Sequence, residues 1–138
     1  MSCVVLDAEA MSTLARGGPH DAVVRAALSA AVSEQIDVLV PAAVLAECYR
    51  GPRHDPAIDA CLSREGGIGV VPTDRSLARR VGHLLAAAAR GSEHHVDATV
   101  VASAALAGGG LILTGDVGDL EALAPPGSGI AVRGLADR

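Results

Sequence analysis

The sequence predicts an α/β fold, a three-layer α/β/α sandwich around a central and mostly parallel five-stranded sheet. Short apolar runs alternate with longer segments of helical pattern along the chain. The first of these runs, residues 3–6, is apolar at every position, as in a strand that is buried on both faces. Strands separated by helices imply right-handed crossovers and parallel pairing. The 138 residues fit a single domain, 1–138, with one core.

Each element has its own local signal. Gly17, Gly18 and Pro19 end the first helix, and Pro41 suits the first turn of the helix that carries Glu47. Thr73 is the expected N-cap of a long helix that reaches about Arg90. The expected strands are 3–6, 37–40, 68–71, 111–114 and 130–132, and the expected helices are 8–16, 20–33, 41–50, 55–64, 73–90, 95–107 and 116–123.

The composition excludes several classes of function. The chain has no Lys, so it has neither a P-loop lysine nor a Schiff-base or kinase lysine. Its one aromatic residue, Tyr49, leaves almost nothing on which the bases of a single strand can stack. The net charge of −5 argues against a free-standing electrostatic binder of nucleic acid, unless bound metal neutralises part of it.

The chain carries signals of an intracellular protein. Its three cysteines, Cys3, Cys48 and Cys61, form no CxxC pair and are expected to be reduced thiols. The N-terminus lacks the basic region of a signal peptide. No uncharged apolar run approaches the roughly 18 residues that span a bilayer. We therefore expect a soluble, cytoplasmic protein without membrane contact.

Four acidic residues stand at joints of the predicted elements: Asp7, Glu47, Asp97 and Asp116. Each follows or opens an apolar segment, and an unpaired buried charge costs several kcal/mol, roughly. In open α/β sheets, functional groups gather outside the carboxyl ends of the strands, so these acids are expected to converge there. Carboxylate oxygens are the ligands of hard cations, and the pattern therefore predicts a divalent-metal site.

Helix capping is the competing explanation. Asp97 alone, or Asp116 with Asp119 as a capping-box partner, fits a cap as well as a ligand. Asp7 follows four apolar strand residues and is expected to have no capping role. Glu47 is expected to share an apolar helix face with its neighbours one turn earlier. The adjacent pair His94-His95 has a poor spacing for two metal ligands, which argues against structural zinc.

The ordered segments VVLDAEAMSTLA, VPAAVLAE, HHVDATVVASAA and LILTGDVGDLEALA resemble the PIN-domain ribonucleases, and most of all the VapC-type toxins of bacterial toxin–antitoxin pairs. The resemblance covers essentially the whole chain. It implies that Asp7, Glu47, Asp97 and Asp116 are catalytic and hold Mg²⁺, with Mn²⁺ as a substitute. It also implies that Asp119 is a fifth acid of the metal site, either as an accessory ligand or behind the direct ligands, and that the Thr114 hydroxyl supports the last acid pair.

The chain departs from the family pattern after the first acid. Family members often carry Ser or Thr close to that position, whereas Ala8 and Glu9 follow Asp7 here. The nearest hydroxyls are those of Ser12 and Thr13, a turn further on. Glu9 is expected to face solvent. Because the acid set is complete, we expect an active enzyme.

The resemblance implies a metal-dependent endoribonuclease that cleaves RNA by hydrolysis, without using the 2′-OH as nucleophile. It also implies a cognate antitoxin whose C-terminal segment covers the acidic groove. The Ala-rich helix around 77–89 is the candidate face of a homodimer. The candidates for contact with RNA phosphate are Arg16, Arg50 and Arg53, whereas Arg75, Arg79 and Arg80 are expected to form a solvated face.

Two other functions fit the sequence. One is a PIN nuclease that processes RNA outside any toxin–antitoxin pair. The other is a catalytically silent domain that uses its acidic groove to dock a basic peptide. Metal-dependent cleavage distinguishes both nucleases from the silent domain, and a neighbouring reading frame for an antitoxin distinguishes toxin from processing enzyme.

Overall fold

A computed structural model describes residues 2–65 and 67–136, so the domain predicted over 1–138 is described without Met1, Gly66, Asp137 and Arg138. Its centre is a five-stranded sheet in the order β3-β2-β1-β4-β5. The strands are β1 (Cys3–Leu6), β2 (Asp37–Pro41), β3 (Ile68–Val71), β4 (Gly110–Thr114) and β5 (Ile130–Gly134). All four strand pairings are parallel, which confirms the α/β prediction and makes the described sheet wholly rather than mostly parallel.

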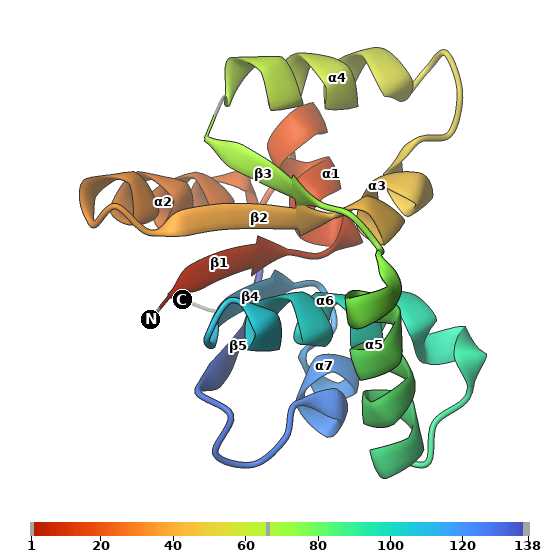
Figure 1. Ribbon diagram of the computed structural model, residues 1–138. Coiled ribbons are helices and arrows are strands. Elements are labelled where there is room, and N and C mark those ends of the chain that lie inside the picture. The colour runs from red at the N-terminus through yellow and green to blue at the C-terminus, as the bar shows by residue number, and fades with distance from the viewer. Residues whose placement is uncertain (1, 66, 137–138) are drawn as a thin grey trace.

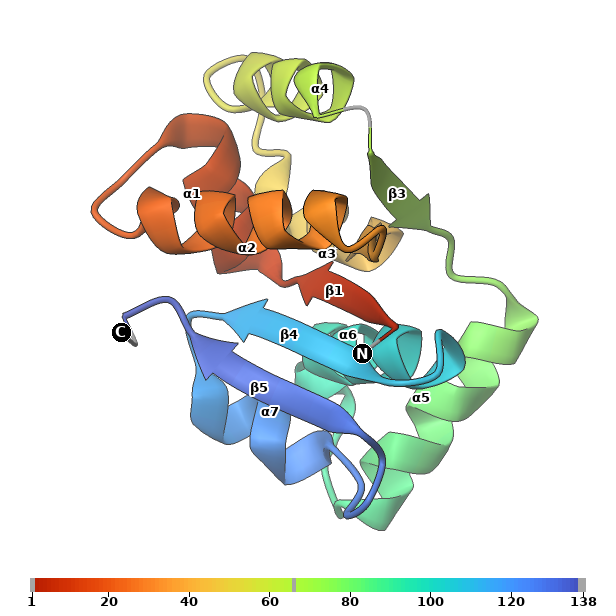
Figure 2. The same cartoon turned by 90° about the vertical axis from the view of Figure 1, so that its left-hand side faces the viewer.

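Helices cover both faces of this sheet (Figures 1 and 2). The helices α1 and α2 pack on one face, with α4 against α1, whereas α6 packs on the other face with α5 and α7 beside it. The short α3 lies against both α1 and α6. The bounds are α1 (Ala8–Arg16), α2 (Asp21–Ser33), α3 (Ala42–Cys48), α4 (Asp55–Arg64), α5 (Arg75–Ala87), the 3₁₀ helix η1 (Ser92–His94), α6 (His95–Leu106) and α7 (Val117–Leu123).

The strand order reverses between β1 and β4. From β1 the chain builds outward through β2 to β3, and then α5, η1 and α6 return it to the other side of β1. The two central strands pair in register, with Val4 opposite Leu111 and Leu6 opposite Leu113. In open parallel sheets such a reversal opens a crevice beyond the carboxyl ends of the two strands. The fold therefore places its functional edge after Leu6 and after Thr114.

The core is aliphatic, as the lack of Phe and Trp requires. Helix α6 is buried continuously from Ala98 to Ala104. Two polar residues lie in this stretch, and each donates its hydroxyl to a carbonyl one turn earlier: Thr99 to His95 O and Ser103 to Thr99 O, both at 2.8 Å. Because these hydroxyls are satisfied within the helix, α6 can be buried on nearly every side without an orphaned polar group.

Two predicted helix starts were wrong by one residue. The N-cap of α5 is Asp74 and not Thr73, because the Asp74 carboxylate accepts the Leu77 N–H at 2.8 Å. A carboxylate is the stronger N-cap, since it also interacts favourably with the helix dipole. Pro41 is the last residue of β2 and occupies the N-cap position of α3, so the first turn of that helix begins at Ala42.

The glycine run after α6 ends the helix, close to the expected end at residue 107. Gly108 and Gly109 have φ values of 91° and 96°, in the left-handed region that L side chains avoid. The Gly109 N–H donates to Ala104 O at 2.9 Å, which closes the helix end. Gly110 then begins β4, where a Cβ would collide with the carbonyl oxygen of Cys3.

The cysteines and the lengths of the helices complete the description of the fold. Cys3, Cys48 and Cys61 are buried and unbridged, consistent with reduced thiols packed as small apolar groups. Within residues 2–65 and 67–136, no helix combines the length and the apolar character that crossing a bilayer requires.

Candidate metal centre

Asp7 lies where β1 passes into α1, beside the end of β4. Its N–H donates to Leu113 O at 3.1 Å and so extends the pairing of the two strands by one bond. Its carboxylate accepts two backbone N–H groups, from Ala10 at 2.9 Å on Oδ1 and from Gly115 at 3.3 Å on Oδ2. The strand ends therefore hold this side chain in one orientation within the crevice.

The expectation that Asp7 has no capping role was wrong. Asp7 is the N-cap of α1, and its Oδ1 accepts the Ala10 N–H in the usual N-cap arrangement. Four apolar residues followed by Asp mark the end of a strand. They do not show that a helix starts at the next residue. Capping and metal binding are compatible here, because a carboxylate has about four lone-pair sites and the cap uses one of them.

Asp97 and Asp119 come together from two different helices. Asp97 lies in the first turn of α6 and Asp119 in the first turn of α7. Together with His94 they form a cluster in which one ligand atom from each residue lies within 4.8 Å of the others. All three residues are half-buried. Asp97 is not an N-cap, because the N-cap position of α6 is occupied by His94.

The electrostatics of the crevice disfavour the ionised form of two of these acids. Burial raises the pKa of Asp7 above its usual value, although the N–H groups of Ala10 and Gly115 oppose this shift. Burial also raises the pKa of Asp97, and the neighbouring carboxylates of Asp119 and Asp7 raise it further. Carboxylates crowded in this way repel one another, and a bound cation relieves that repulsion.

Asp116 caps α7 and links β4 to that helix. Its Oδ1 accepts the Asp119 N–H at 3.3 Å, as the capping alternative predicted. Its own N–H donates to the hydroxyl of Thr114 at 2.9 Å. Thr114 is fully buried, and its hydroxyl also lowers the pKa of Asp7. Asp116 itself is exposed, just beyond the carboxyl end of β4.

Glu47 does not lie on a buried helix face, contrary to expectation. Its side chain is exposed, whereas its neighbour Cys48 is buried and contacts Ala8 O and the Ser12 hydroxyl at 3.5 Å. The helix α3 is short, and its buried face is formed by Val44, Leu45 and Cys48. Glu47 is therefore an exposed residue of a helix that packs on α1 and α6, whereas Asp7, Asp97, Asp116 and Asp119 lie at the strand ends.

Three residues near the cluster were missed or set aside on sequence grounds. His94 was dismissed because it adjoins His95, although its spacing of three from Asp97 places both on one helix face. Arg90 lies with its Nη1 3.4 Å from His94 Nε2 and 4.0 Å from Asp119 Oδ1. Glu9 is exposed, as expected, but its carboxylate occupies the space that a Cβ at Gly115 would need, and its charge raises the pKa of Asp7.

The arginines proposed for RNA contact have different surroundings. The Arg50 guanidinium donates to Ala46 O and Tyr49 O at 3.1 and 3.2 Å, so it caps the end of α3. Arg53 is exposed in the loop that follows. Arg16 ends the nine-residue α1, about 13 Å along the helix from Asp7. Arg90, by contrast, lies against the acidic cluster, 4.0 Å from Asp119 Oδ1.

The donor set fits a divalent cation. A metal–ligand distance of about 2.1 Å places two ligand atoms at most about 4.2 Å apart, on opposite sides of the ion. The spread of the ligand atoms in His94, Asp97 and Asp119 is within 4.8 Å, which small side-chain rotations bring to that limit. Two carboxylates and one imidazole suit a six-coordinate ion that keeps several waters.

Comparison with known proteins identifies the family. The PIN domain model matches residues 4–124 of this chain. Among curated proteins, none matches. A chain in the crystal structure of VapBC2 from Rickettsia felis bound to a DNA fragment from their promoter has the same fold, with a TM-score of 0.66 and 11% identity. That match covers 96% of this chain and 98% of the other. The chain belongs to the PIN domain family, whose members are generally nucleases.

Proposed function

We propose that this protein is an endoribonuclease that hydrolyses RNA phosphodiester bonds and depends on Mg²⁺ or Mn²⁺. The observation that carries the proposal is the gathering of Asp7, Asp97 and Asp119 at the point where the strand order of a PIN fold reverses. Burial and mutual repulsion oppose the ionisation of Asp7 and Asp97. Holding these carboxylates close together costs free energy, and a bound divalent cation would offset that cost.

A divalent cation bound at these carboxylates would activate a water molecule and offset the charge that builds on the phosphate. The chain supplies the geometry. Backbone N–H groups of Ala10 and Gly115 orient Asp7, and the Asp116 carboxylate holds the first turn of α7, from which Asp119 projects. The Arg90 guanidinium adds a planar positive group suited to a phosphate oxygen.

The remaining acids have supporting places in the proposed site. Asp116, with one oxygen used as a cap, would offer its second oxygen to the cation. Glu47 extends from α3, whose packing against both α1 and α6 brings that helix beside the crevice. We therefore assign Asp7, Glu47, Asp97, Asp116 and Asp119 to the metal site, and Thr114 to the support of Asp7 and Asp116.

The biological setting that we propose is a toxin–antitoxin pair in the cytoplasm. The match to a VapBC2 chain supports a cognate antitoxin as partner, because that structure holds the two components on promoter DNA. We also propose that residues 1–138 form one domain that associates as a homodimer, and that Arg50 and Arg53 lie along the path of the RNA. Light scattering of the purified protein, alone and with the product of a neighbouring reading frame, measures both associations.

RNA cleavage by the purified protein tests the proposed activity. We expect cleavage of total RNA with Mg²⁺ or Mn²⁺, and none with EDTA or in the Asp97→Asn variant. The matched control is Asp59→Asn, which removes a carboxylate from the exposed face of α4, where it accepts the Tyr49 hydroxyl at 2.6 Å. If the folded, antitoxin-free protein cuts no RNA under any of these conditions, the nuclease proposal is wrong and a peptide-docking domain becomes the better explanation.

A further inference from the structure

His94 reaches the acidic cluster from an unusual position in the chain. It is the last residue of η1 and the N-cap of α6, three residues before Asp97. Its side chain is only 20% exposed. A ring nitrogen of His94 lies within 4.8 Å of a carboxylate oxygen on Asp97 and on Asp119. The cluster is therefore a mixed nitrogen and oxygen donor set rather than a group of acids alone.

The usual structural roles do not account for this histidine. At the N-cap of α6 its side chain makes no capping hydrogen bond with the described residues. Its neighbour Glu93 lies 4.0 Å from Nε2, but Glu93 is 72% exposed, and such exposed pairs contribute little to stability. The half-buried ring is thus placed toward the cluster without a capping bond to fix it there.

The contact with Arg90 involves the electron pair of a ring nitrogen of His94. Arg90 Nη1 lies 3.4 Å from His94 Nε2. A guanidinium has donors and no acceptor, so a hydrogen bond between Arg90 and His94 has Nε2 as its acceptor. An imidazole nitrogen with an available electron pair is the form that binds a metal ion.

Arg90 also shows that a cation is favoured at this point. The same Nη1 lies 4.0 Å from Asp119 Oδ1, so the guanidinium stands between the His94 nitrogen and the Asp119 carboxylate. Its side chain is 34% exposed and can move toward solvent when another cation takes its place. The positive charge of Arg90 therefore lies beside two of the donor groups of the cluster.

We propose that His94 is a direct nitrogen ligand of the metal centre and that it makes the site prefer Mn²⁺ over Mg²⁺. Imidazole nitrogen binds first-row transition ions well, whereas Mg²⁺ strongly prefers oxygen ligands and retains its waters. An all-carboxylate site lacks this discrimination. The inference rests on the proposed metal-dependent function and adds to it the ligand that sets which ion is held.

Metal binding, rather than activity, is the direct test. Dissociation constants for Mn²⁺ and Mg²⁺ are measured by calorimetry on the wild-type protein, His94→Ala, His94→Asn and the matched control His95→Ala. We expect the preference for Mn²⁺ over Mg²⁺ to fall about tenfold in both His94 variants and to stay unchanged in His95→Ala. His94→Asn keeps a polar oxygen ligand at this position, so its Mg²⁺ affinity is expected to stay close to that of the wild type.

Electron spin-echo spectroscopy of bound Mn²⁺ gives an independent result. A directly coordinated imidazole adds a nitrogen coupling, which we expect in the wild type and in His95→Ala and not in His94→Ala. If the wild type binds Mn²⁺ without that coupling and with an unchanged ion preference in the His94 variants, the inference is wrong, while the metal centre stands. If the wild type binds neither ion, the proposed metal-dependent function fails as well.

Discussion

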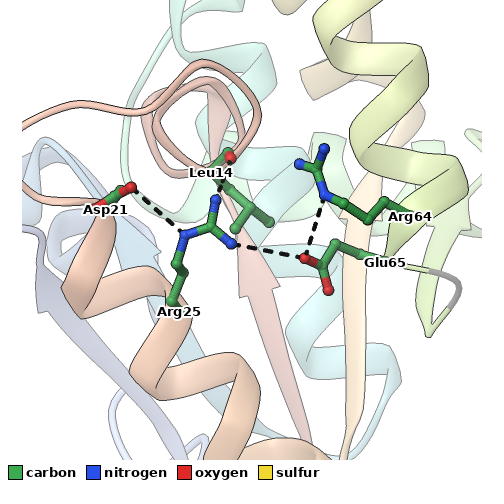
Figure 3. Close-up of polar contacts among 5 residues, drawn as sticks. All are labelled: Leu14, Asp21, Arg25, Arg64 and Glu65. Carbon is green, nitrogen blue, oxygen red and sulfur yellow. Dashed lines mark hydrogen bonds and ion pairs between the residues drawn. The ribbon is translucent and has the colours of Figure 1, made fainter.

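Two charged regions of the molecule differ in how far neighbouring groups compensate their charges. At the carboxyl ends of β1 and β4, Asp7, Asp97 and Asp119 crowd together, and burial raises the pKa of Asp7 and of Asp97. Between α1, α2 and the end of α4, the Arg25 guanidinium pairs instead with Asp21 and Glu65 at 3.5 and 3.8 Å (Figure 3). The second region balances its charge within the chain, whereas the first has mainly Arg90 to offset several carboxylates.

Size alone does not identify a functional site in this protein. A cleft of about 830 Å³ lies beside the Arg25 cluster, lined by parts of α2, the start of β2 and the end of α4. Three of its charged groups already face partners: Arg25 donates to Leu14 O at 3.5 Å, and Arg64 lies 3.9 Å from Glu65 (Figure 3). Charge left uncompensated among neighbouring groups is the better indicator of a ligand here, because compensated charge has no further need of one.

The largest expected difference between the two regions is in catalysis. We expect Asp97→Asn to lower RNA cleavage at least about 100-fold, since changes even behind the metal ligands typically cost 10–100-fold in metal affinity or activity. Glu65→Gln removes a charge from the balanced cluster and is expected to leave cleavage unchanged. Initial cleavage rates at saturating Mn²⁺ compare the two variants. Equal losses in both would show that the contrast between the regions has no functional meaning.

A second comparison separates the two roles of Asp7. Asp7→Ala removes the N-cap of α1 and is expected to destabilise the metal-free protein by about 1 kcal/mol. Asp7→Asn retains a good N-cap and removes the buried charge, so we expect it to raise the stability measured in EDTA. Urea unfolding followed by circular dichroism provides both free energies. If Asp7→Asn is no more stable in EDTA than the wild type, the charge costs the fold nothing.

The stabilisation by Asp7→Asn is expected to depend on pH with a definite sign. The folded-state pKa of Asp7 lies above its ordinary value of 3.8, so the folded protein binds this proton more tightly than the unfolded chain. That contribution to stability is complete below 3.8 and is lost as pH rises through the folded pKa. The advantage of Asp7→Asn in EDTA should therefore grow from pH 4 toward neutrality. An advantage that is constant with pH would exclude the charge as its cause.

The sequence predicted the order of elements, the parallel sheet and the family, because these depend on long apolar runs and on the order of acids along the chain. It placed Asp7, Asp97 and Asp116 at the correct edge of the sheet for the same reason. It did not predict that Asp7 caps α1 or that Glu47 is exposed, since both depend on where a helix begins and which face packs. The sequence also did not predict that Arg90 lies beside His94, because this contact depends on the turn between α5 and η1.

The smallest effect is expected in the balanced cluster. Arg25 is 48% exposed, and exposed ion pairs contribute about 0.2–1 kcal/mol each. Arg25→Gln should therefore lower the free energy of unfolding by less than about 2 kcal/mol, with much of the loss disappearing in 1 M salt because the pairs are screened. Urea unfolding at low and high salt measures this change. A loss that is large and insensitive to salt would show that Arg25 acts through packing rather than through its ion pairs.

The central claim is that the crowded carboxylates form a cation site, and the thermal midpoint of unfolding with and without Mn²⁺ tests it most directly. At a free Mn²⁺ concentration of 100 times the dissociation constant, binding stabilises the folded state by about 2.7 kcal/mol, or roughly 10 °C for a domain of this size. We expect this rise in the wild-type protein and in Glu65→Gln, and little of it in Asp97→Asn. A midpoint that Mn²⁺ leaves unchanged in the wild type, or raises equally in Asp97→Asn, would contradict the claim.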